Sequence, residues 1–385
     1  MSTRLGANTL WLLLMRFGAQ GLMVLFTLLI ARRLGEVGLG EYAFIAAVVF
    51  VANALTSFGT DMLLIREIAA GSNLDRLPPA LALQLGLSTV CVAAVFIGAP
   101  LLPGQSPESV HGLQLYSLAL LPLAFFTVFT TALRGKQRMD LYTILNLLVS
   151  LGQLLGVWLF VQPGSSVRVV AACLLVTQVA AAVLAGSLCA VYIPDFWRAW
   201  RFSFSAVLAL ARASAPIALL GLLGMTYQKL SVYMLATLTG AAMTGWFSAS
   251  MRVVEAFKLI HLALFGALYP AMSQARQTKS AQSEATFRAS GRSLLAVSTT
   301  AVLGLFAFAS PLVASLYGPT FEPSIPALRI LAWTLIPYTI NTYLSLSFLA
   351  VGRERRVARA LFASLLALTI LNLWWIPVGG LVGAC

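Results

Sequence analysis

Eleven apolar runs, each about 20 residues long and separated by short turns, most constrain what this chain can fold into. Each run is long enough to cross a bilayer as a helix, and none alternates in hydrophobicity as a barrel strand does. Since 60% of the 385 residues are hydrophobic and only 10% are charged, we predict an all-α polytopic membrane protein. The runs lie near residues 8–30, 42–64, 79–102, 112–133, 141–161, 168–193, 210–238, 243–272, 291–316, 324–350 and 359–376.

The basic residues are divided unequally between the two sides of the predicted membrane. If the N-terminus is cytoplasmic, most of the 25 Lys and Arg residues fall in inside segments. Only Arg32, Arg33 and Arg168 fall in outside turns. This asymmetry follows the positive-inside rule, so we expect a cytoplasmic N-terminus. The net charge of +13 is then explained by topology and by anionic membrane lipids, and nucleic-acid binding is not supported.

The chain contains a pattern that occurs twice. Residues 31–44 recur without a gap at 236–249, a shift of 205 residues, and a second matched pair follows at 135–138 and 352–355. Two anchors in the same order indicate two homologous halves, a common construction for secondary transporters. The matched positions are Ala31 and Ala236, Gly35 and Gly240, Gly40 and Gly245, and Tyr42 and Phe247.

The order of the anchors predicts how the halves are related. The second to fourth apolar runs lie between the anchors of the first half, and the eighth to tenth lie between those of the second. Each run therefore has its counterpart six runs later, and an even shift preserves the direction of crossing. We therefore expect parallel repeats: an N-terminal lobe at 1–193, a cytoplasmic linker at 194–209 and a C-terminal lobe at 210–385. On this count the last helix of a 6+6 arrangement is missing. We expect the chain to be an incomplete version of a twelve-span protein.

Several segments resemble one known family. They include residues 31–44 with 58–69, the stretch from Pro216 through 227–235 to 245–255, and 316–321 with Gly352 and Arg353. Together they resemble the polysaccharide (O-antigen and repeat-unit) flippases of the multidrug/oligosaccharidyl-lipid/polysaccharide exporter superfamily. The resemblance covers nearly the whole chain. It implies a MATE-like, two-lobe transporter in a bacterial or archaeal plasma membrane.

Ionisable residues within the spans are the candidate substrate site. Each costs about 3 kcal/mol near the bilayer centre, so it should face a cavity or a partner. Arg16 and Lys229 lie in the leading spans of the two halves, whereas Arg252, Glu255 and Lys258 recur at every third residue of one span. We predict that the four basic residues form a cationic cavity for an anionic headgroup, because Arg and Lys suit phosphate oxygens.

Simpler roles for the same residues stay open. Arg16 could snorkel to the interface, and Arg252 could be neutralised by Glu255 at i, i+3. No cofactor is expected, and the four cysteines show no spacing typical of a metal site or a disulfide framework. The superfamily implies that a proton or sodium gradient returns the empty carrier. Glu255 is the candidate coupling residue, and Asp61 could bind a coupling cation or anchor a loop.

The resemblance implies a flippase that moves a polyprenyl-diphosphate-linked oligosaccharide from the inner to the outer leaflet by alternating access. The expected partners are this lipid, the surrounding membrane lipids and polysaccharide assembly proteins. A multidrug cation exporter is an alternative, although five basic residues against one acidic residue within the spans disfavour it. A lipid II flippase shares the anionic diphosphate and stays open. An enzyme is not expected, because the outer turns are short and carry no clustered acids.

Overall fold

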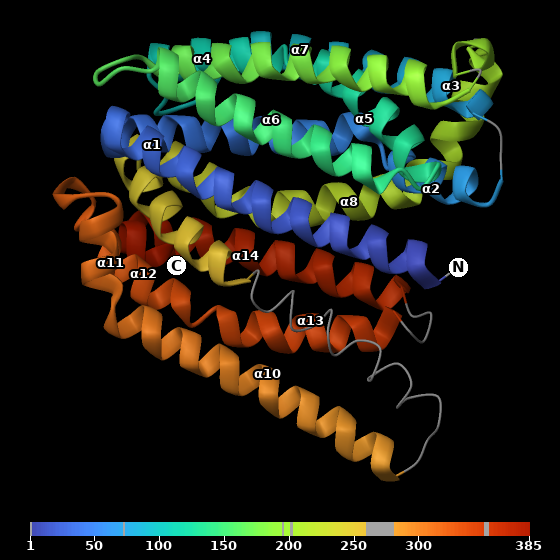
Figure 1. Cartoon of the computed structure of the whole chain (residues 1–385). Helices are drawn as coiled ribbons and strands as arrows, with labels where there is room; N and C mark the ends of the chain where they lie inside the picture. Colours follow the sequence, from blue (N-terminus) through green and yellow to red (C-terminus); the bar gives the residue numbers. More distant parts are fainter. Residues whose placement is uncertain (1, 72–73, 195, 201–202, 259–280, 350–353) are drawn as a thin grey trace.

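The computed structural model describes residues 2–71, 74–194, 196–200, 203–258, 281–349 and 354–385. Within these ranges every regular element is a helix, and none is a strand. The long helices lie side by side, running back and forth between the two ends of the bundle, and α10 (Ala281–Ala307) slants away from the others (Figure 1). The predicted all-α fold is therefore confirmed.

The helices follow one another as long rods joined by short turns. Residues 241–258 are also helical, and the short 3₁₀ helices are η1 (Leu74–Arg76), η2 (Ala99–Leu101), η3 (Phe196–Ala199) and η4 (Pro319–Phe321). The α-helices are α1 (Ser2–Ser57), α2 (Thr60–Ala69), α3 (Leu77–Gly98), α4 (Pro107–Ser117), α5 (Leu120–Gly135), α6 (Met139–Phe160), α7 (Val167–Tyr192), α8 (Phe204–Leu238), α10 (Ala281–Ala307), α11 (Ala309–Leu316), α12 (Ser324–Ala332), α13 (Leu335–Leu349) and α14 (Glu354–Gly383).

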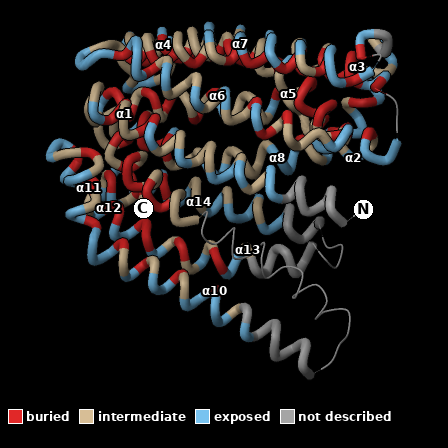
Figure 2. The backbone as a smooth tube through the Cα atoms, in the orientation of Figure 1, coloured by how far each residue is buried: buried red, intermediate tan, exposed pale blue. Residues whose placement is uncertain are grey.

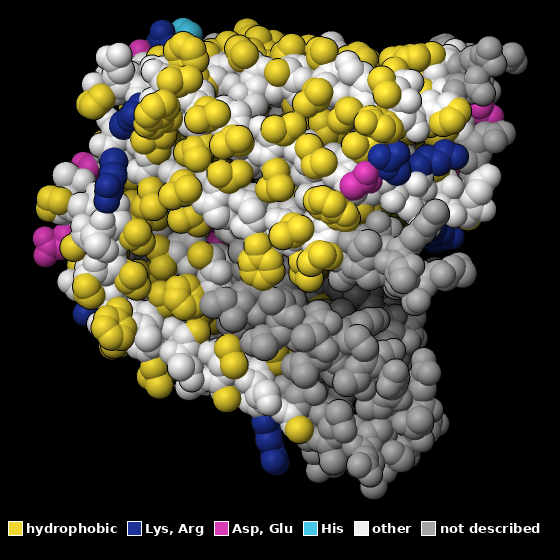
Figure 3. Space-filling model, in the orientation of Figure 1, with side chains coloured by type: hydrophobic (Ala, Val, Ile, Leu, Met, Phe, Trp, Pro, Cys, Tyr) yellow, Lys and Arg dark blue, Asp and Glu magenta, His cyan; other side chains and the backbone are white. Residues whose placement is uncertain are grey.

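The described helices are long and apolar enough for repeated membrane crossing. Seven helical stretches meet the length and hydropathy of a span, and a bent pair, α10 with α11, raises the number to eight. Figure 3 shows hydrophobic side chains over the middle of the visible face and charged side chains mainly toward its edges. This belt is the surface that lipid tails require. The second half of the predicted span 243–272, from residue 259 onward, lies outside the described residues.

One continuous stretch, α1, contains two of the predicted spans. Gly35 interrupts the helix with φ 68° and ψ −168°, and the chain reverses direction there, at the left of Figure 1. Its counterpart Gly240 also has a positive φ, 95°, between α8 and residues 241–258. Positive φ is readily available only to glycine, so both copies of the repeat reverse by the same backbone device.

Some predicted spans are interrupted rather than continuous. The helix predicted over 42–64 ends at Ser57, because Phe58 and Gly59 have φ of 49° and 65°. A β-carbon added at Gly59 would lie 2.9 Å from the backbone nitrogen of Ala218, so the break lets α8 approach closely. Hydropathy reveals the length of an apolar run but not such a turn within it.

Three further spans are also interrupted. The span predicted over 112–133 is divided between α4 and α5, and α10 meets α11 at an angle of 67° within the span predicted over 291–316. The run predicted over 324–350 is likewise divided between α12 and α13. Several membrane-spanning segments therefore consist of two shorter helices, where the apolar runs predicted one continuous helix.

The two ends of the bundle differ in character. We call the end with the Gly35 and Gly240 turns the glycine end, and the opposite end the basic end. The basic end holds α2 and the connection between α5 and α6, with Arg134, Lys136 and Arg138. In Figure 1 the glycine end lies at the left, and the N-terminus lies at the right with α2.

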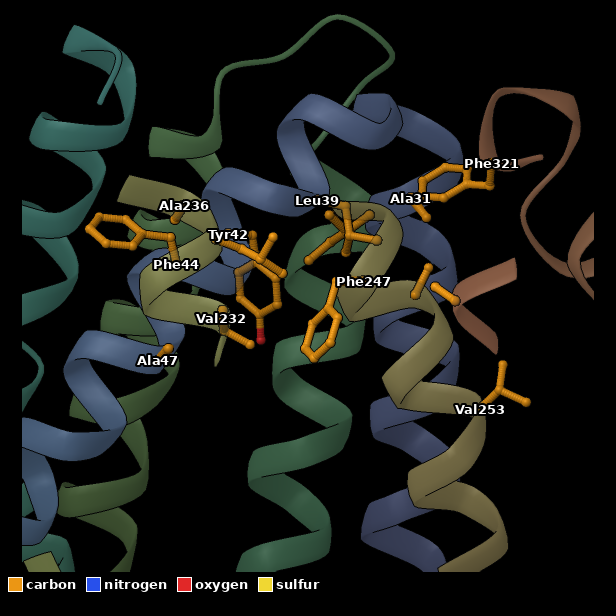
Figure 4. Close-up of a cluster of buried hydrophobic side chains, with 14 of the residues drawn as sticks. Ala31, Leu39, Tyr42, Phe44, Ala47, Val232, Ala236, Phe247, Val253 and Phe321 are labelled. Atoms are coloured by element: carbon orange, nitrogen blue, oxygen red, sulfur yellow. The ribbon is translucent and has the colours of Figure 1, made fainter. Parts of the chain in front are cut away.

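A shared hydrophobic core joins the two halves near the glycine end. Figure 2 shows buried residues where helices face one another and exposed residues along the outer surfaces. Figure 4 shows Tyr42 and Phe247, which are counterparts in the repeat, close together with Leu39 beside them. Phe44 lies near Ala236 in the same view, and its ring stacks on Tyr233 of α8 at 6.0 Å. The repeated segments thus pack against each other.

The connection between the halves is anchored to the first half. Phe196 of η3 is buried, and its ring meets Phe129 of α5 edge-on at 5.8 Å. Helix α8 begins at Phe204, inside the segment predicted as a linker, since the helix extends beyond the apolar run itself. The domain limits at 193 and 209 stay predictions.

Candidate substrate cavity between the halves

Four of the predicted site residues lie together between α8 and residues 241–258. The Arg252 guanidinium donates to the Glu255 carboxylate at 2.9 Å, one helical turn apart. Lys229 interacts electrostatically with Glu255 and Arg252, and Lys258 interacts with Glu255 and Lys229. We call these four residues the charged cluster. With three basic groups and one acidic group, it is net cationic even though Arg252 is paired.

Aromatic rings hold the two lysines of the charged cluster. The Lys229 ammonium lies 5.3 Å from the ring centroid of Phe50 on α1, and the Lys258 ammonium lies 5.1 Å from that of Tyr338 on α13. Such cation–π contacts contribute about 0.5–2 kcal/mol and leave the cation's charge in place. Since α1 and α13 belong to different halves, the cluster lies where the halves meet.

Two buried tyrosines flank the charged cluster. Tyr42 of α1 and Tyr317, which follows α11, both interact electrostatically with Arg252 and Glu255. The Tyr317 hydroxyl donates to the carbonyl oxygen of Ala249 at 3.2 Å, so its position is fixed. Sequence reasoning did not assign either tyrosine to the site. The one sequence signal for Tyr42 was its alignment with Phe247 in the repeat, which marks both as positions where the halves correspond.

A cavity of about 600 Å³ extends from this region toward the basic end. One wall comes from α1, α2, α5 and α6, and the opposite wall comes from α8 through residues such as Ala218, Gly221 and Met225. Phe50, which lies under the Lys229 ammonium, also lines the cavity, so cavity and charged cluster adjoin. Its polar lining residues are Asn53, Ser57, Asp61, Thr127, Thr130, Thr131, Arg134 and Tyr142.

The other two predicted site residues lie apart from the charged cluster. Asp61, in the first turn of α2, lines the cavity near the basic end together with Arg134. Arg16 is exposed on α1 and, within the described part of the chain, makes no hydrogen bond or ion pair. Its counterpart under the 205-residue shift is Gly221, which lines the cavity. Across the described residues, no cluster of His, Cys, Asp and Glu could hold a metal ion.

At the glycine end the halves touch through their backbones. A β-carbon added at Gly40 would overlap the carbonyl oxygen of Ala241, and one added at Gly245 would overlap that of Glu36. Glu36 and Ala241 are counterparts, as are the two glycines, so the contact is reciprocal about a pseudo-twofold axis. This geometry supports the prediction of two parallel repeats.

Side chains close the glycine end further. Arg32 donates to the carbonyl oxygens of Leu316 and Ser315 at 2.9 and 2.8 Å, and Gln105 donates to that of Ala236 at 3.0 Å. These bonds join the first half to the second. The space between the halves is therefore sealed at the glycine end, while the cavity lies nearer the basic end.

A family model described as polysaccharide biosynthesis protein matches residues 5–276, well over half of the chain. The chain belongs to this family. The match confirms the resemblance drawn from the repeated and flanking segments. A search of curated proteins finds none that matches the chain.

Solved structures with a similar fold are transporters of the MOP superfamily. The lipid II flippase MurJ in an inward closed conformation aligns with a TM-score of 0.80 at 13% identity, covering 96% of this chain and 82% of that one. An inward-facing multidrug resistance MATE family transporter aligns with a TM-score of 0.74 at 18% identity, covering 95% and 89%. An outward-facing MATE family transporter aligns with a TM-score of 0.64 at 16% identity, covering 98% and 90%.

These likenesses establish the fold. The chain is a multi-pass membrane protein with the two-lobe fold of MATE and MurJ transporters, as the sequence predicted. The family model describes polysaccharide biosynthesis proteins, and the structural neighbours named above are transporters and a flippase.

Proposed function

We propose that this protein is a flippase that moves a polyprenyl-diphosphate-linked oligosaccharide from the inner to the outer leaflet of a bacterial or archaeal plasma membrane. The observation that carries the proposal is the net-cationic charged cluster, half-buried between two halves of a transporter fold. A diphosphate is the part of such a lipid that must be removed from water. Lys and Arg in a shielded site are suited to bind it.

The same cluster disfavours a drug cation as cargo. Lys229, Lys258 and Arg252 would repel a cation, and the Glu255 carboxylate is already paired with Arg252. A positive site bound to a positive ligand loses affinity through like-charge repulsion. Lipid II, which carries the same diphosphate, is the second candidate, and the fold shared with the lipid II flippase MurJ favours it.

Alternating access supplies the direction of movement. The glycine end is sealed by backbone contact and the cavity lies toward the basic end, so this conformation would accept a substrate from the basic end. The positive-inside rule assigns the basic end and the N-terminus to the cytoplasm. Rocking of the halves would then break the Gly40–Gly245 contact and release the headgroup outside.

Coupling to an ion gradient would use the Arg252–Glu255 pair. When the Glu255 carboxylate is ionised it holds Arg252, and protonation or a bound cation would free Arg252 for the diphosphate. Asp61 is the second candidate for a coupling cation, since it faces the cavity. Polysaccharide assembly proteins are the proposed partners outside the membrane step.

The test is a leaflet-translocation assay in proteoliposomes that contain this chain. One set of vesicles carries a labelled polyprenyl-diphosphate saccharide, and a parallel set contains a fluorescent organic cation. We expect movement of the lipid-linked saccharide alone. Movement of the cation alone would overturn the proposal and would mean that the charged cluster is structural.

A further inference from the structure

We propose that the cavity between α1, α5 and α8 binds the sugar units next to the diphosphate, while the charged cluster binds the diphosphate itself. This inference rests on the proposed function and assigns the two chemical parts of the substrate to two places. The cavity has a volume of about 600 Å³, adjoins the charged cluster at Phe50 and runs toward the basic end.

The lining of the cavity has the chemistry that sugars require. Saccharides offer neutral hydroxyl groups and apolar ring faces, so their sites combine uncharged polar side chains with aromatic rings. Phe50, Phe126 and Tyr142 supply rings, whereas Asn53 and Thr127 supply an amide and a hydroxyl. The backbone carbonyls of Asn53 and Thr127 accept from the Thr56 and Thr130 hydroxyls, whereas within the described residues the Asn53 side-chain amide and the Thr127 hydroxyl make no hydrogen bond. Both are available to a ligand.

Helix α5 shows independently that this space is polar. Thr127, Thr130, Thr131 and Arg134 all line the cavity, and their spacing of i, i+3, i+4 and i+7 forms one stripe along the helix. Thr130 uses its hydroxyl to donate to the carbonyl oxygen of Phe126, but the hydroxyl oxygen can still accept. A polar stripe within a membrane span must face something other than lipid.

The repeat shows why the sugar and the diphosphate would bind at different places. Under the 205-residue shift, Phe50 and Asn53 are the counterparts of Glu255 and Lys258. Equivalent helices of the two halves therefore turn the same face toward the shared space. The second half presents charge on that face, and the first half presents an aromatic ring and an amide. A diphosphate sugar carries the same division between a charged part and a neutral part.

Two charged residues lie at the basic end of the cavity. Asp61 and Arg134 both line it, but among the described residues no ion pair joins them, and Arg134 lies over the Tyr142 ring at 5.1 Å. The Asp61 carboxylate can accept from neighbouring sugar hydroxyls, and the Arg134 guanidinium can donate to ring or carboxylate oxygens. These residues would discriminate among saccharides by the groups that reach the basic end.

The experiment separates the sugar site from the diphosphate site. Proteoliposomes with the full chain receive polyprenyl diphosphate, either without sugar or carrying one of a panel of neutral, N-acetylated and acidic disaccharides. The variants are Asn53→Leu and Thr127→Val, which remove polar atoms at similar volume, and Arg252→Gln in the charged cluster. The control is Thr89→Val, because Thr89 is exposed on α3 and donates to the Leu85 carbonyl oxygen, away from the cavity.

We expect Asn53→Leu and Thr127→Val each to slow movement of the preferred disaccharide lipid about tenfold, the effect of losing one or two hydrogen bonds. Movement of the sugar-free lipid should stay within about twofold of the unaltered protein, a change too small to reflect a lost hydrogen bond. Arg252→Gln should slow both lipids. Equal effects of the cavity variants on both lipids, or none on either, would overturn the sugar site while leaving the flippase proposal intact.

A binding measurement tests the sugar site separately in case the protein is not a flippase. If the unaltered protein moves no lipid, binding of the free disaccharides to detergent-solubilised protein is measured by calorimetry. Binding that Asn53→Leu weakens about tenfold, and that Arg252→Gln leaves unchanged, would support a saccharide site in a protein that is not a flippase. Absence of binding to the unaltered protein would overturn the sugar site as well.

Discussion

The second helix of each half tells the two halves apart. Residues 36–57 and 241–258 follow a glycine with positive φ, and each contributes one glycine to the reciprocal contact at the glycine end. Along the same face, however, Ala47, Phe50 and Asn53 of one helix stand where Arg252, Glu255 and Lys258 stand in the other. The backbone arrangement is duplicated, whereas the chemistry at these matched positions is not.

This difference reflects two different constraints, one on the glycine contact and one on the residues near the cavity. The glycines are fixed by steric contact between two backbones, which tolerates no β-carbon in either copy. The cavity face is not subject to that constraint, so its residues can differ and make an asymmetric site. An asymmetric cargo, charged at one end and neutral at the other, is the match for such a site.

The largest effect should come from the charged face. Arg252→Gln and Lys258→Gln should each lower flipping about a hundredfold, because each removes a charge-assisted contact to the diphosphate and disturbs the cluster. The translocation assay measures this, with membrane yield as the check on insertion. Arg329→Gln is the matched control, since Arg329 lies over Phe306 instead. Normal flipping in both variants would mean that the charges on residues 241–258 do not bind the substrate, so the two helices would not differ in function.

The next largest effect should come from the feature that the halves share. Gly40→Val and Gly245→Val should weaken the glycine-end contact by about 1–3 kcal/mol, since each forces the backbones apart. A cysteine placed at Leu39, which is 1% exposed, should then react about tenfold faster with an impermeant maleimide in a background lacking the native cysteines.

The two glycine variants should act equally, because their contact is reciprocal. Gly86→Val is the control, since a side chain there meets nothing within 4 Å. If only one of the two variants exposed the cysteine, the pseudo-symmetric description of the glycine end would be wrong.

A smaller effect on flipping should come from removing the aromatic ring of Phe50 in the first half. Phe50→Leu removes the ring under the Lys229 ammonium and should lower flipping about threefold, in line with the loss of one cation–π contact. Phe50→Tyr keeps a ring face and should retain activity in the same assay. Phe96→Leu, on an exposed position of α3, is the control. Indistinguishable Leu and Tyr variants would mean that Phe50 only fills space.

The smallest effect should come from Arg16, which is exposed and separate from the charged cluster. Arg16→Gln should lower flipping about twofold at low salt, as expected of one exposed charge that snorkels to the aqueous interface. Raising the ionic strength should abolish the difference, because salt screens exposed charges. A salt-independent loss as large as that of Arg252→Gln would assign Arg16 to the cluster after all.

Much of this organisation could be predicted from the sequence. The apolar runs gave the helical membrane fold, and the matched glycines gave the repeat, because both depend on local residue types. Spacing within one helix brought Arg252, Glu255 and Lys258 together, and the leading-helix argument added Lys229.

Other features depend on contacts between distant segments. The break at Phe58 and Gly59 lets α8 approach closely, and the hydropathy of the apolar run does not reveal it. This cavity was missed because its polar residues come from four different helices. The threonine stripe on α5 was visible in the sequence, but threonine is common within membrane helices and was not read as a site. Arg16 was grouped with the other basic residues because the sequence leaves open whether it faces the cavity or snorkels to the interface.

The Gly40–Gly245 contact also bears on how such a chain could arise. Gly40 meets Ala241 and Gly245 meets Glu36, and the residues of each kind are counterparts in the repeat. A protein of half this length with one such glycine could therefore make the same contact with a second copy of itself. A homodimer of that kind would have carried identical cavity faces. Joining the two copies in one gene freed each face to change alone, so the separation of charge from neutral surface could evolve only after the duplication.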